Sequence, residues 1–160
     1  MRLSTRGRYA VMAMVEMAAR AKDGGACLDG RPVTLSEIAA AQHLSVAYLE
    51  QLFGRLRRAG LVASARGPGG GYRLTRPAAA IAIAEVVEAA DEPITATRCE
   101  EGGVGCLAGQ RCLTHDLWAE LGDQIRLFLR GLTLADVVDG RVLGRARSPG
   151  EPPAPRAATG

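Results

Sequence analysis

Apolar side chains recur at helical spacing through residues 5–20, near the start of the chain. This run is also dense in alanine and methionine, which favour helices. The pattern predicts a core helix, and the residues that step along one of its faces are Tyr9, Met12, Val15 and Ala19. Glycine and proline then crowd residues 22–32, so the chain is expected to turn before the next element.

Two short helices joined by a tight turn are predicted over residues 35–58. Thr34 and Glu37 have the spacing of a capping box, so a helix is expected from about Leu35 to Gln42. Ser45 is a good N-cap for a second helix, which Gly60 ends. The apolar positions of that second helix are Val46, Leu49, Leu52, Phe53 and Leu56. Two helices joined in this way form a helix-turn-helix.

A glycine-rich hairpin is predicted over residues 61–75. Residues 61–65 and 72–75 are strand candidates, and the sequence Arg-Gly-Pro-Gly-Gly-Gly lies between them. Glycines permit positive φ and let the backbone approach a surface closely. Beside a helix-turn-helix, this hairpin is interpreted as a wing, so the sequence predicts a winged helix-turn-helix DNA-binding domain over residues 1–76.

The second part of the chain, residues 77–140, is predicted to be helical around a glycine-rich loop. A helix is expected at residues 83–90, and a long one follows from about Leu113 to Arg130. Apolar residues recur on one face of the long helix at spacings of three and four. An aromatic seam on an extension requires a partner, so the seam is predicted to be a dimer interface. Its residues are Trp118, Leu121, Ile125, Phe128 and Leu132.

The end of the chain is expected to contribute little to the core. Thr133 and Asp136 have the spacing to cap one last short helix. Residues 141–160 are rich in proline and arginine and poor in apolar residues, which predicts a disordered tail. The fold class is therefore mainly α with a small β-hairpin wing, in which a long C-terminal dimerisation helix follows the DNA-binding domain.

Charge is distributed unevenly along the 160 residues. Residues 1–76 hold 12 Lys or Arg against 5 Asp or Glu, whereas residues 77–140 hold 4 against 11. This asymmetry indicates an N-terminal part that binds a polyanion and a second part with another role. No run of about 18 apolar residues occurs and nothing near the start is typical of a signal peptide, so a cytoplasmic protein without a membrane segment is expected.

The second helix of the helix-turn-helix and the hairpin supply the predicted DNA contacts. Gln51 could bond adenine, Glu50 could accept from cytosine N4, and the small Ala47 could touch a thymine methyl group. Arginines near the helix end and at the hairpin mouth would attract phosphate, with glycine amides as further donors. The full set is Ser45, Ala47, Tyr48, Glu50, Gln51, Arg55, Arg58, Arg66, Gly69 and Gly70.

Three cysteines and one histidine lie within a span of seventeen residues that includes the glycine-rich loop. They are Cys99, Cys106, Cys112 and His115. Three thiolates and one imidazole make a complete four-ligand set, and loop amides can donate to sulfur as iron-sulfur clusters require. Zinc accepts the same ligands, but zinc knuckles usually have shorter gaps between cysteines, so the spacing favours a cluster. Cys27 lies apart and has no assigned role.

Several long segments together resemble the iron-sulfur cluster regulators of the IscR family, within a larger group of winged-helix repressors. The segments are residues 1–4 and 7–11, Tyr-Leu-Glu-Gln-Leu-Phe at 48–53, Arg-Gly-Pro-Gly-Gly-Gly-Tyr at 66–72, Thr-Arg-Cys at 97–99, and Cys-Leu-Thr-His at 112–115. The resemblance extends from Met1 to about Val138.

The resemblance implies a homodimer that binds a 2Fe-2S cluster through Cys99, Cys106, Cys112 and His115. Such regulators repress cluster-assembly genes when loaded, and cluster occupancy selects between two classes of DNA site. The implied partners are a double-stranded DNA operator and the cluster-assembly machinery as cluster donor. Glu50 and Gln51 then lie on the recognition helix and Arg66 on the wing.

Two alternatives remain open at this stage. A zinc-stabilised or thiol-redox repressor would use the same DNA-binding half with a different signal. An iron-sulfur electron carrier would need the cysteines but gives no reason for the basic half or the wing. No nucleophile with a positioned base and no paired acid and base is present, so an enzyme is not expected.

Overall fold

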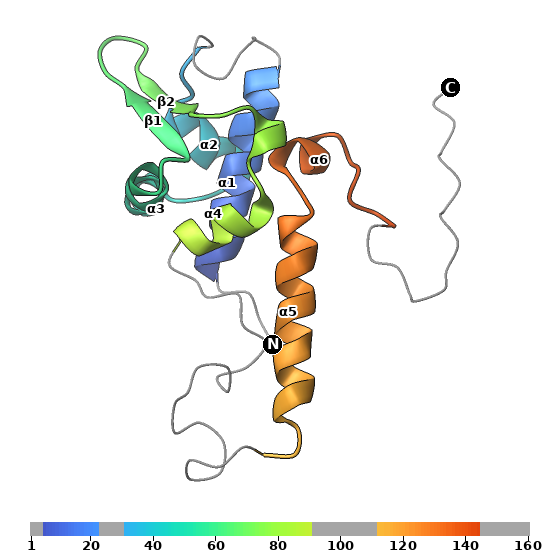
Figure 1. Cartoon of the computed structure of the whole chain (residues 1–160). Helices are drawn as coiled ribbons and strands as arrows, with labels where there is room; N and C mark the ends of the chain where they lie inside the picture. The colour runs from blue at the N-terminus through green and yellow to red at the C-terminus, as the bar shows by residue number, and fades with distance from the viewer. Residues whose placement is uncertain (1–4, 23–30, 91–111, 145–160) are drawn as a thin grey trace, which may run out of the picture.

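The computed structural model describes residues 5–22, 31–90 and 112–144. Helices dominate these ranges, and one two-stranded hairpin stands at the edge of the helical body (Figure 1). The elements in chain order are α1 (Thr5–Lys22), α2 (Leu35–Gln42), α3 (Val46–Arg58), β1 (Val62–Ala65), β2 (Gly71–Leu74), the 3-10 helix η1 (Ala78–Ala80), α4 (Ile83–Ala89), α5 (His115–Arg130) and α6 (Leu134–Val138). This architecture confirms a mainly α fold with a small β-hairpin wing and a long C-terminal helix, while the dimerisation role of that helix stays a prediction. No helix of the described ranges is long and apolar enough to cross a membrane.

Helix α1 runs through the centre of the body, in contact with α2, α4 and α6. The predicted face of α1, with Tyr9, Met12, Val15 and Ala19, is only partly buried, although Tyr9 and Val15 pack against the core. The fully buried residues are Ala10, Ala13, Met14, Met17 and Ala18. Three of these are alanines, whose small side chains let the surrounding helices approach closely. Hydrophobicity alone did not separate the two faces, because both carry apolar residues.

The helix-turn-helix is built as the capping signals predicted. The Thr34 backbone amide donates to Glu37 Oε2 at 2.8 Å, and the Glu37 amide donates to Thr34 Oγ1 at 3.2 Å. Helix α2 ends at His43, which has left-handed backbone angles (φ 53°, ψ 44°) and donates its amide to the Ala39 carbonyl. The Ser45 hydroxyl then accepts from the Tyr48 amide at 3.4 Å to begin α3. The left-handed residue produces the sharp turn between the two helices.

The hairpin is tied back to the helical body at its base. Strand β1 pairs antiparallel with β2, with Val62 opposite Leu74 and Ala65 opposite Gly71. Val33, just before α2, pairs with Tyr72 through two backbone hydrogen bonds of 2.9 and 2.8 Å. The Tyr72 ring also meets the Phe53 ring edge-on, with centroids 4.9 Å apart. The direction of the hairpin is therefore fixed relative to α2 and α3.

Gly71, like Gly70 before it, is a position at which the hairpin has no room for a side chain. A Cβ atom there would lie 2.5 Å from the Val33 carbonyl oxygen, in the paired backbone just described. Gly71→Ala should therefore lower the free energy of unfolding by about 1–3 kcal/mol, the usual cost of overpacking. Gly54→Ala is the matched control, because a Cβ atom at Gly54 would meet nothing within 4 Å. Within helix α3 this change should stabilise by about 0.5–1 kcal/mol. If wild type and Gly71→Ala unfold at the same urea concentration, the close approach to Val33 does not limit the stability of the protein.

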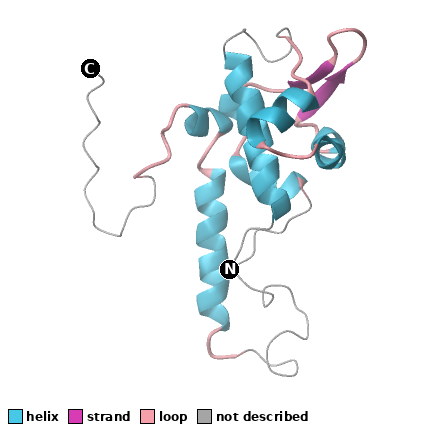
Figure 2. Cartoon of the chain, turned by 180° about the vertical axis from the view of Figure 1, so that it is seen from behind, coloured by secondary structure: helices cyan, strands magenta, loops and turns pink. Residues whose placement is uncertain are grey.

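Helix α5 projects from the body like an arm, and its C-terminal end is the anchored one (Figures 1 and 2). The chain after α5 pairs with the residues around α4: Ile83 donates to the Leu132 carbonyl at 2.8 Å, and Leu134 donates to the Ile81 carbonyl at 3.0 Å. A capping box of Thr133 and Asp136 begins α6, as predicted. Helix α5 itself starts at His115, two residues later than expected.

Candidate nucleic-acid interface and metal-binding segment

Helix α3 presents a polar face to solvent and buries its apolar face. The buried residues are Leu49, Leu52, Phe53 and Leu56. Of the residues predicted to contact DNA, Tyr48 and Arg55 are half-buried, and those that lie exposed are Ser45, Ala47, Glu50, Gln51 and Arg58. Val46, assigned from the sequence to the apolar stripe, is 39% exposed because it lies in the first turn, beyond the edge of the core. The face needed to enter a groove is accessible.

An ion pair stabilises the N-terminus of helix α2, which precedes α3. Arg31 donates to Glu37 Oε1 at 2.7 Å, while the other oxygen of Glu37 is held by Thr34. The hydrogen bond from the Thr34 backbone, helped by the Thr34 hydroxyl and by Arg31, lowers the pKa of Glu37 below its ordinary value. Glu37 therefore remains ionised at neutral pH, and its charge favours the helix N-terminus.

The wing carries Arg66 exposed at the mouth of the hairpin. Gly67 and Gly69 have positive φ values of 97° and 74°, which shape the tip. The Gly70 amide donates to the Gly67 carbonyl at 2.9 Å. This corrects one predicted contact, because the Gly70 amide is used within the turn rather than directed outward as a phosphate donor.

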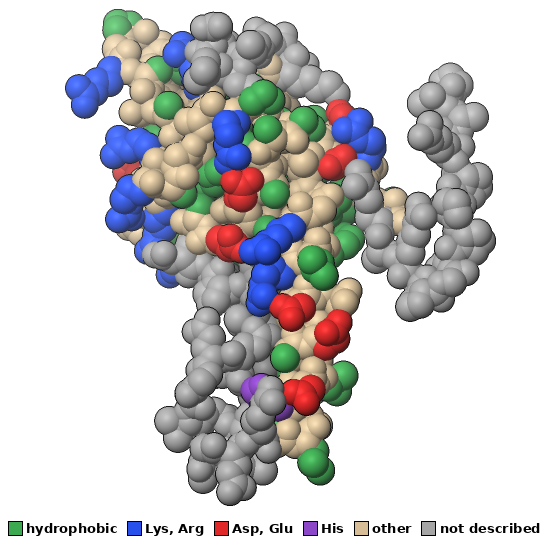
Figure 3. Space-filling model, in the orientation of Figure 1, with side chains coloured by type: hydrophobic (Ala, Val, Ile, Leu, Met, Phe, Trp, Pro, Cys, Tyr) green, Lys and Arg blue, Asp and Glu red, His purple; other side chains and the backbone are tan. Residues whose placement is uncertain are grey.

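Basic side chains predominate on one part of the surface and acidic side chains on another, although α5 also carries Arg126 and Arg130. Figure 3 shows Lys and Arg side chains gathered over the side that carries α3 and the wing, and acidic side chains along α5. The arginines of the last turn of α3 are Arg55, Arg57 and Arg58. The first turn of α5 carries Asp116, and Glu120 and Asp123 follow. The charge asymmetry found in the sequence is thus also an asymmetry in space.

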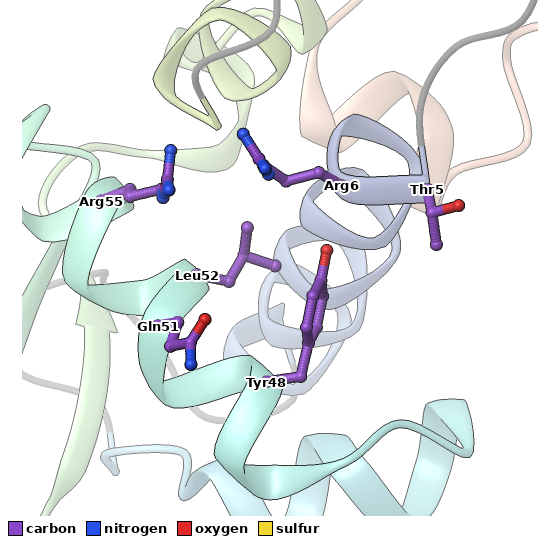
Figure 4. Close-up of a pocket in the computed structure, with 6 residues that line it drawn as sticks. All are labelled: Thr5, Arg6, Tyr48, Gln51, Leu52 and Arg55. Carbon is purple, nitrogen blue, oxygen red and sulfur yellow. The ribbon is translucent and has the colours of Figure 1, made fainter.

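A hollow of about 300 Å³ lies beside α3, on the side of the α1 N-terminus (Figure 4). The residues that line it are Thr5, Arg6, Tyr48, Gln51, Leu52 and Arg55. Four belong to α3, and three of those four were predicted DNA contacts. Arg6 was not predicted, because nothing in the sequence shows that the first turn of α1 lies beside α3.

Cys112 and His115 lie three residues apart and are joined by a backbone hydrogen bond in the turn that leads into α5. The His115 amide donates to the Cys112 carbonyl at 3.1 Å, and the Cys112 sulfur lies 3.4 Å from the Thr114 hydroxyl oxygen. Both side chains are half-buried. A thiol and an imidazole in one turn, with a hydroxyl beside the sulfur, suit a metal centre. Cys99 and Cys106 lie outside the described residues, as does Cys27, so the four-ligand set stays a prediction.

The predicted apolar seam of α5 is present only in part. Trp118 and Phe128 are each 37% exposed, whereas Leu121 and Ile125 are half-buried. Leu132 is a correction: it is only 3% exposed, follows the end of α5, and belongs to the core of the body. It therefore does not extend the seam. Leu117 and Leu127, 60% and 61% exposed, were not singled out from the sequence.

Comparison with known proteins gives consistent matches over most of the chain. Residues 3–140 match the family described as Rrf2, iron-dependent transcriptional regulator. The HTH-type transcriptional regulator IscR of Yersinia enterocolitica is 51% identical over 141 residues, which cover 88% of this chain and 81% of that protein.

Solved structures agree with this assignment. CymR, the global cysteine regulator of B. subtilis, has a TM-score of 0.70 and 33% identity, covering 88% of this chain and 98% of that one. IscR of T. potens has a TM-score of 0.67 and 33% identity, covering 88% of each chain. With its winged helix-turn-helix and its basic surface, the chain belongs to the Rrf2 family of iron-dependent transcriptional regulators and is a DNA-binding regulator of the IscR type.

Proposed function

We propose that this regulator works as a homodimer and senses the occupancy of a 2Fe-2S cluster, and that the cluster-assembly genes are among those it represses. The observation that carries the proposal is the placement of Cys112 and His115 together at the start of α5, at the end of that helix away from its anchor. The proposed donor of the cluster is the cluster-assembly machinery, and the proposed site of action is the cytoplasm.

The proposed DNA contacts follow from the exposed face of α3. With α3 in the major groove, Gln51 would bond the N6 and N7 edge of adenine, and Glu50 would accept from cytosine N4. Arg66 on the wing would bind phosphate or enter a minor groove. Arg58 donates through Nε to the Gly54 carbonyl at 3.3 Å, which orients its guanidinium at the end of α3. The base contacts would give specificity, and the arginines most of the affinity.

The proposed cluster ligands are Cys99, Cys106, Cys112 and His115. The chemistry of the two described ligands fits this role, since thiolate and imidazole both bind iron. The Thr114 hydroxyl beside the Cys112 sulfur would orient that ligand. When bound, the cluster would supply the iron-dependent signal. By holding the cluster, Cys112 and His115 would fix the conformation of the first turn of α5.

The proposed dimer forms along α5, whose aromatic residues Trp118 and Phe128 each keep 37% of their surface exposed within the described part of the protomer. Trp118 and Phe128, ten residues apart and about 80° apart around the helix, flank the side of α5 that also carries Leu121 and Ile125. A second copy would bury both, as apolar seams of paired helices do. The two recognition helices of a dimer would then read two half-sites of one operator.

Substitutions on the DNA-binding surface test the proposed contacts. Arg66→Ala should weaken binding to a cognate fragment and make the salt slope of log K less negative by about 0.9, the value for one lost phosphate contact. Gln51→Ala should instead reduce discrimination between cognate and mutated operators by about 1–3 kcal/mol with little change in the slope. Fluorescence anisotropy titrations at several salt concentrations measure both.

The same measurements can contradict the proposal. If both variants bind like the wild type, α3 and the wing do not dock as described. Zinc and iron analysis of anaerobically purified protein separates the proposed cluster from a zinc-stabilised repressor. Zinc bound in a ratio of one per chain without visible absorbance would favour the zinc alternative.

A further inference from the structure

The hollow beside α3 receives positive charge from two different helices. Figure 4 shows the side chains of Arg6, from α1, and Arg55, from α3, both directed into the space above Leu52, with the Tyr48 hydroxyl group below them. Two guanidinium groups that converge on one hollow form a site suited to an anion, because each can donate charge-assisted hydrogen bonds to it. The volume of about 300 Å³ leaves room for a phosphate group.

The hollow and the wing lie on opposite flanks of the recognition helix. On one flank, Tyr48 meets Tyr9 of α1 edge-on, with ring centroids 5.9 Å apart. On the other, Phe53 meets Tyr72 of the wing at 4.9 Å. Between these flanks lies the exposed face that includes Ala47, which α3 would present to base edges. A helix in the major groove has a sugar-phosphate backbone on either side, and here each flank of α3 carries arginine.

We propose that Arg6 and Arg55 together bind a backbone phosphate of the operator, on the side of the recognition helix opposite the wing. The inference rests on the proposed docking of α3 and extends the DNA-binding surface to α1. The contact between Tyr9 and Tyr48 joins α1 to α3, so the two helices that carry the arginines already lie side by side before DNA arrives. Gln51 lines the same hollow, so the phosphate contact would also set the register of the residue that reads bases.

The first test removes the charge of Arg6. Arg6→Gln should bind the operator about tenfold more weakly, equivalent to about 1.4 kcal/mol, with a salt slope less negative by about 0.9. Arg20→Gln is the matched control: it removes the same charge from the same helix, about 20 Å away along the axis. Arg20 is paired with Glu16 at 2.7 Å and does not line the hollow. Equal affinities and slopes for the two variants would overturn the proposal.

The second test identifies the phosphate. Replacing single phosphates of each half-site by neutral methylphosphonate should reveal one position at which the wild type loses affinity and Arg6→Gln does not. If no such position exists, Arg6 does not contact the DNA backbone. The Arg6→Gln, Arg55→Gln double variant should lose less than the sum of the single losses, because both residues bind one group. Additive losses would mean separate contacts.

Two controls keep this test distinct from that of the proposed function. Wild-type protein must bind its operator specifically, and failure there would reject the docking of α3 rather than the role of Arg6. Thermal unfolding followed by circular dichroism shows whether Arg6→Gln is folded. If Arg6→Gln is not folded, Arg55→Gln is used instead. If inorganic phosphate stabilises the wild type while both Arg6→Gln and Arg20→Gln bind DNA normally, the hollow serves a soluble anion, and the proposal is wrong.

Discussion

Cys112→Ala is expected to abolish the visible absorbance of the protein after anaerobic reconstitution with iron and sulfide. The loss should be complete, because a thiolate ligand carries both a covalent bond to iron and the negative charge that offsets the metal. Cys112 is the cysteine of the proposed set whose surroundings are described, at the start of α5 beside Thr114. Cys99→Ala and Cys106→Ala should have the same result.

Cys27→Ala is the matched control for these variants, because it removes a thiol outside the proposed ligand set. It should retain the absorbance and the iron content of the wild type. If Cys27→Ala loses the absorbance and Cys112→Ala keeps it, the ligand assignment is wrong. His115→Ala should have an intermediate effect on the absorbance, because an imidazole ligand is neutral and its loss leaves three thiolates in place.

Phe128→Glu is expected to convert the proposed dimer to monomers. Phe128 lies on the exposed aromatic side of α5, and a carboxylate buried there without a partner would cost several kcal/mol. Sedimentation velocity at micromolar concentration should show the lower mass, and DNA affinity should fall because a monomer contacts one half-site.

Leu127→Glu is the control, since Leu127 is 61% exposed and lies about 180° around the helix from Trp118. This variant should remain a dimer. A dimeric Phe128→Glu beside a monomeric Leu127→Glu would place the interface on the side of α5 that carries Leu127, about 100° around the helix from Phe128. If both variants remain dimers, the interface lies elsewhere in the protein.

The helix-turn-helix and wing could be predicted from the sequence because their signals are local. A capping box at Thr34 and Glu37, an N-cap at Ser45 and a glycine run at the hairpin tip each act within a few residues. The same holds for Thr133 and Asp136, which begin α6 as expected. Such signals work because the groups they satisfy are neighbours in the chain.

The failures concern contacts between residues far apart in the sequence. Leu132 continued the spacing of the seam, but the turn after α5 places it against the residues around Ile83, where it is buried. The buried side of α1 was also misassigned, because α1 is apolar on more than one face and its neighbours decide which is covered. Arg6 was missed for a related reason: only folding brings α1 beside α3.

The arrangement of α5 has a mechanical consequence. Its C-terminal end is fastened to the body by the Arg130–Glu88 ion pair at 3.7 Å and by the backbone hydrogen bonds of Leu132 and Leu134 just after it, whereas Cys112 and His115 lie at the other end. Sixteen residues of helix make a rod of about 24 Å. A tilt of about 5° around the fastened end would move the other end by about 2 Å, with no change in the rod itself. A small displacement at the proposed ligands would therefore rotate α5 about its fastened end, where it contacts α4, without any rearrangement within α5 itself.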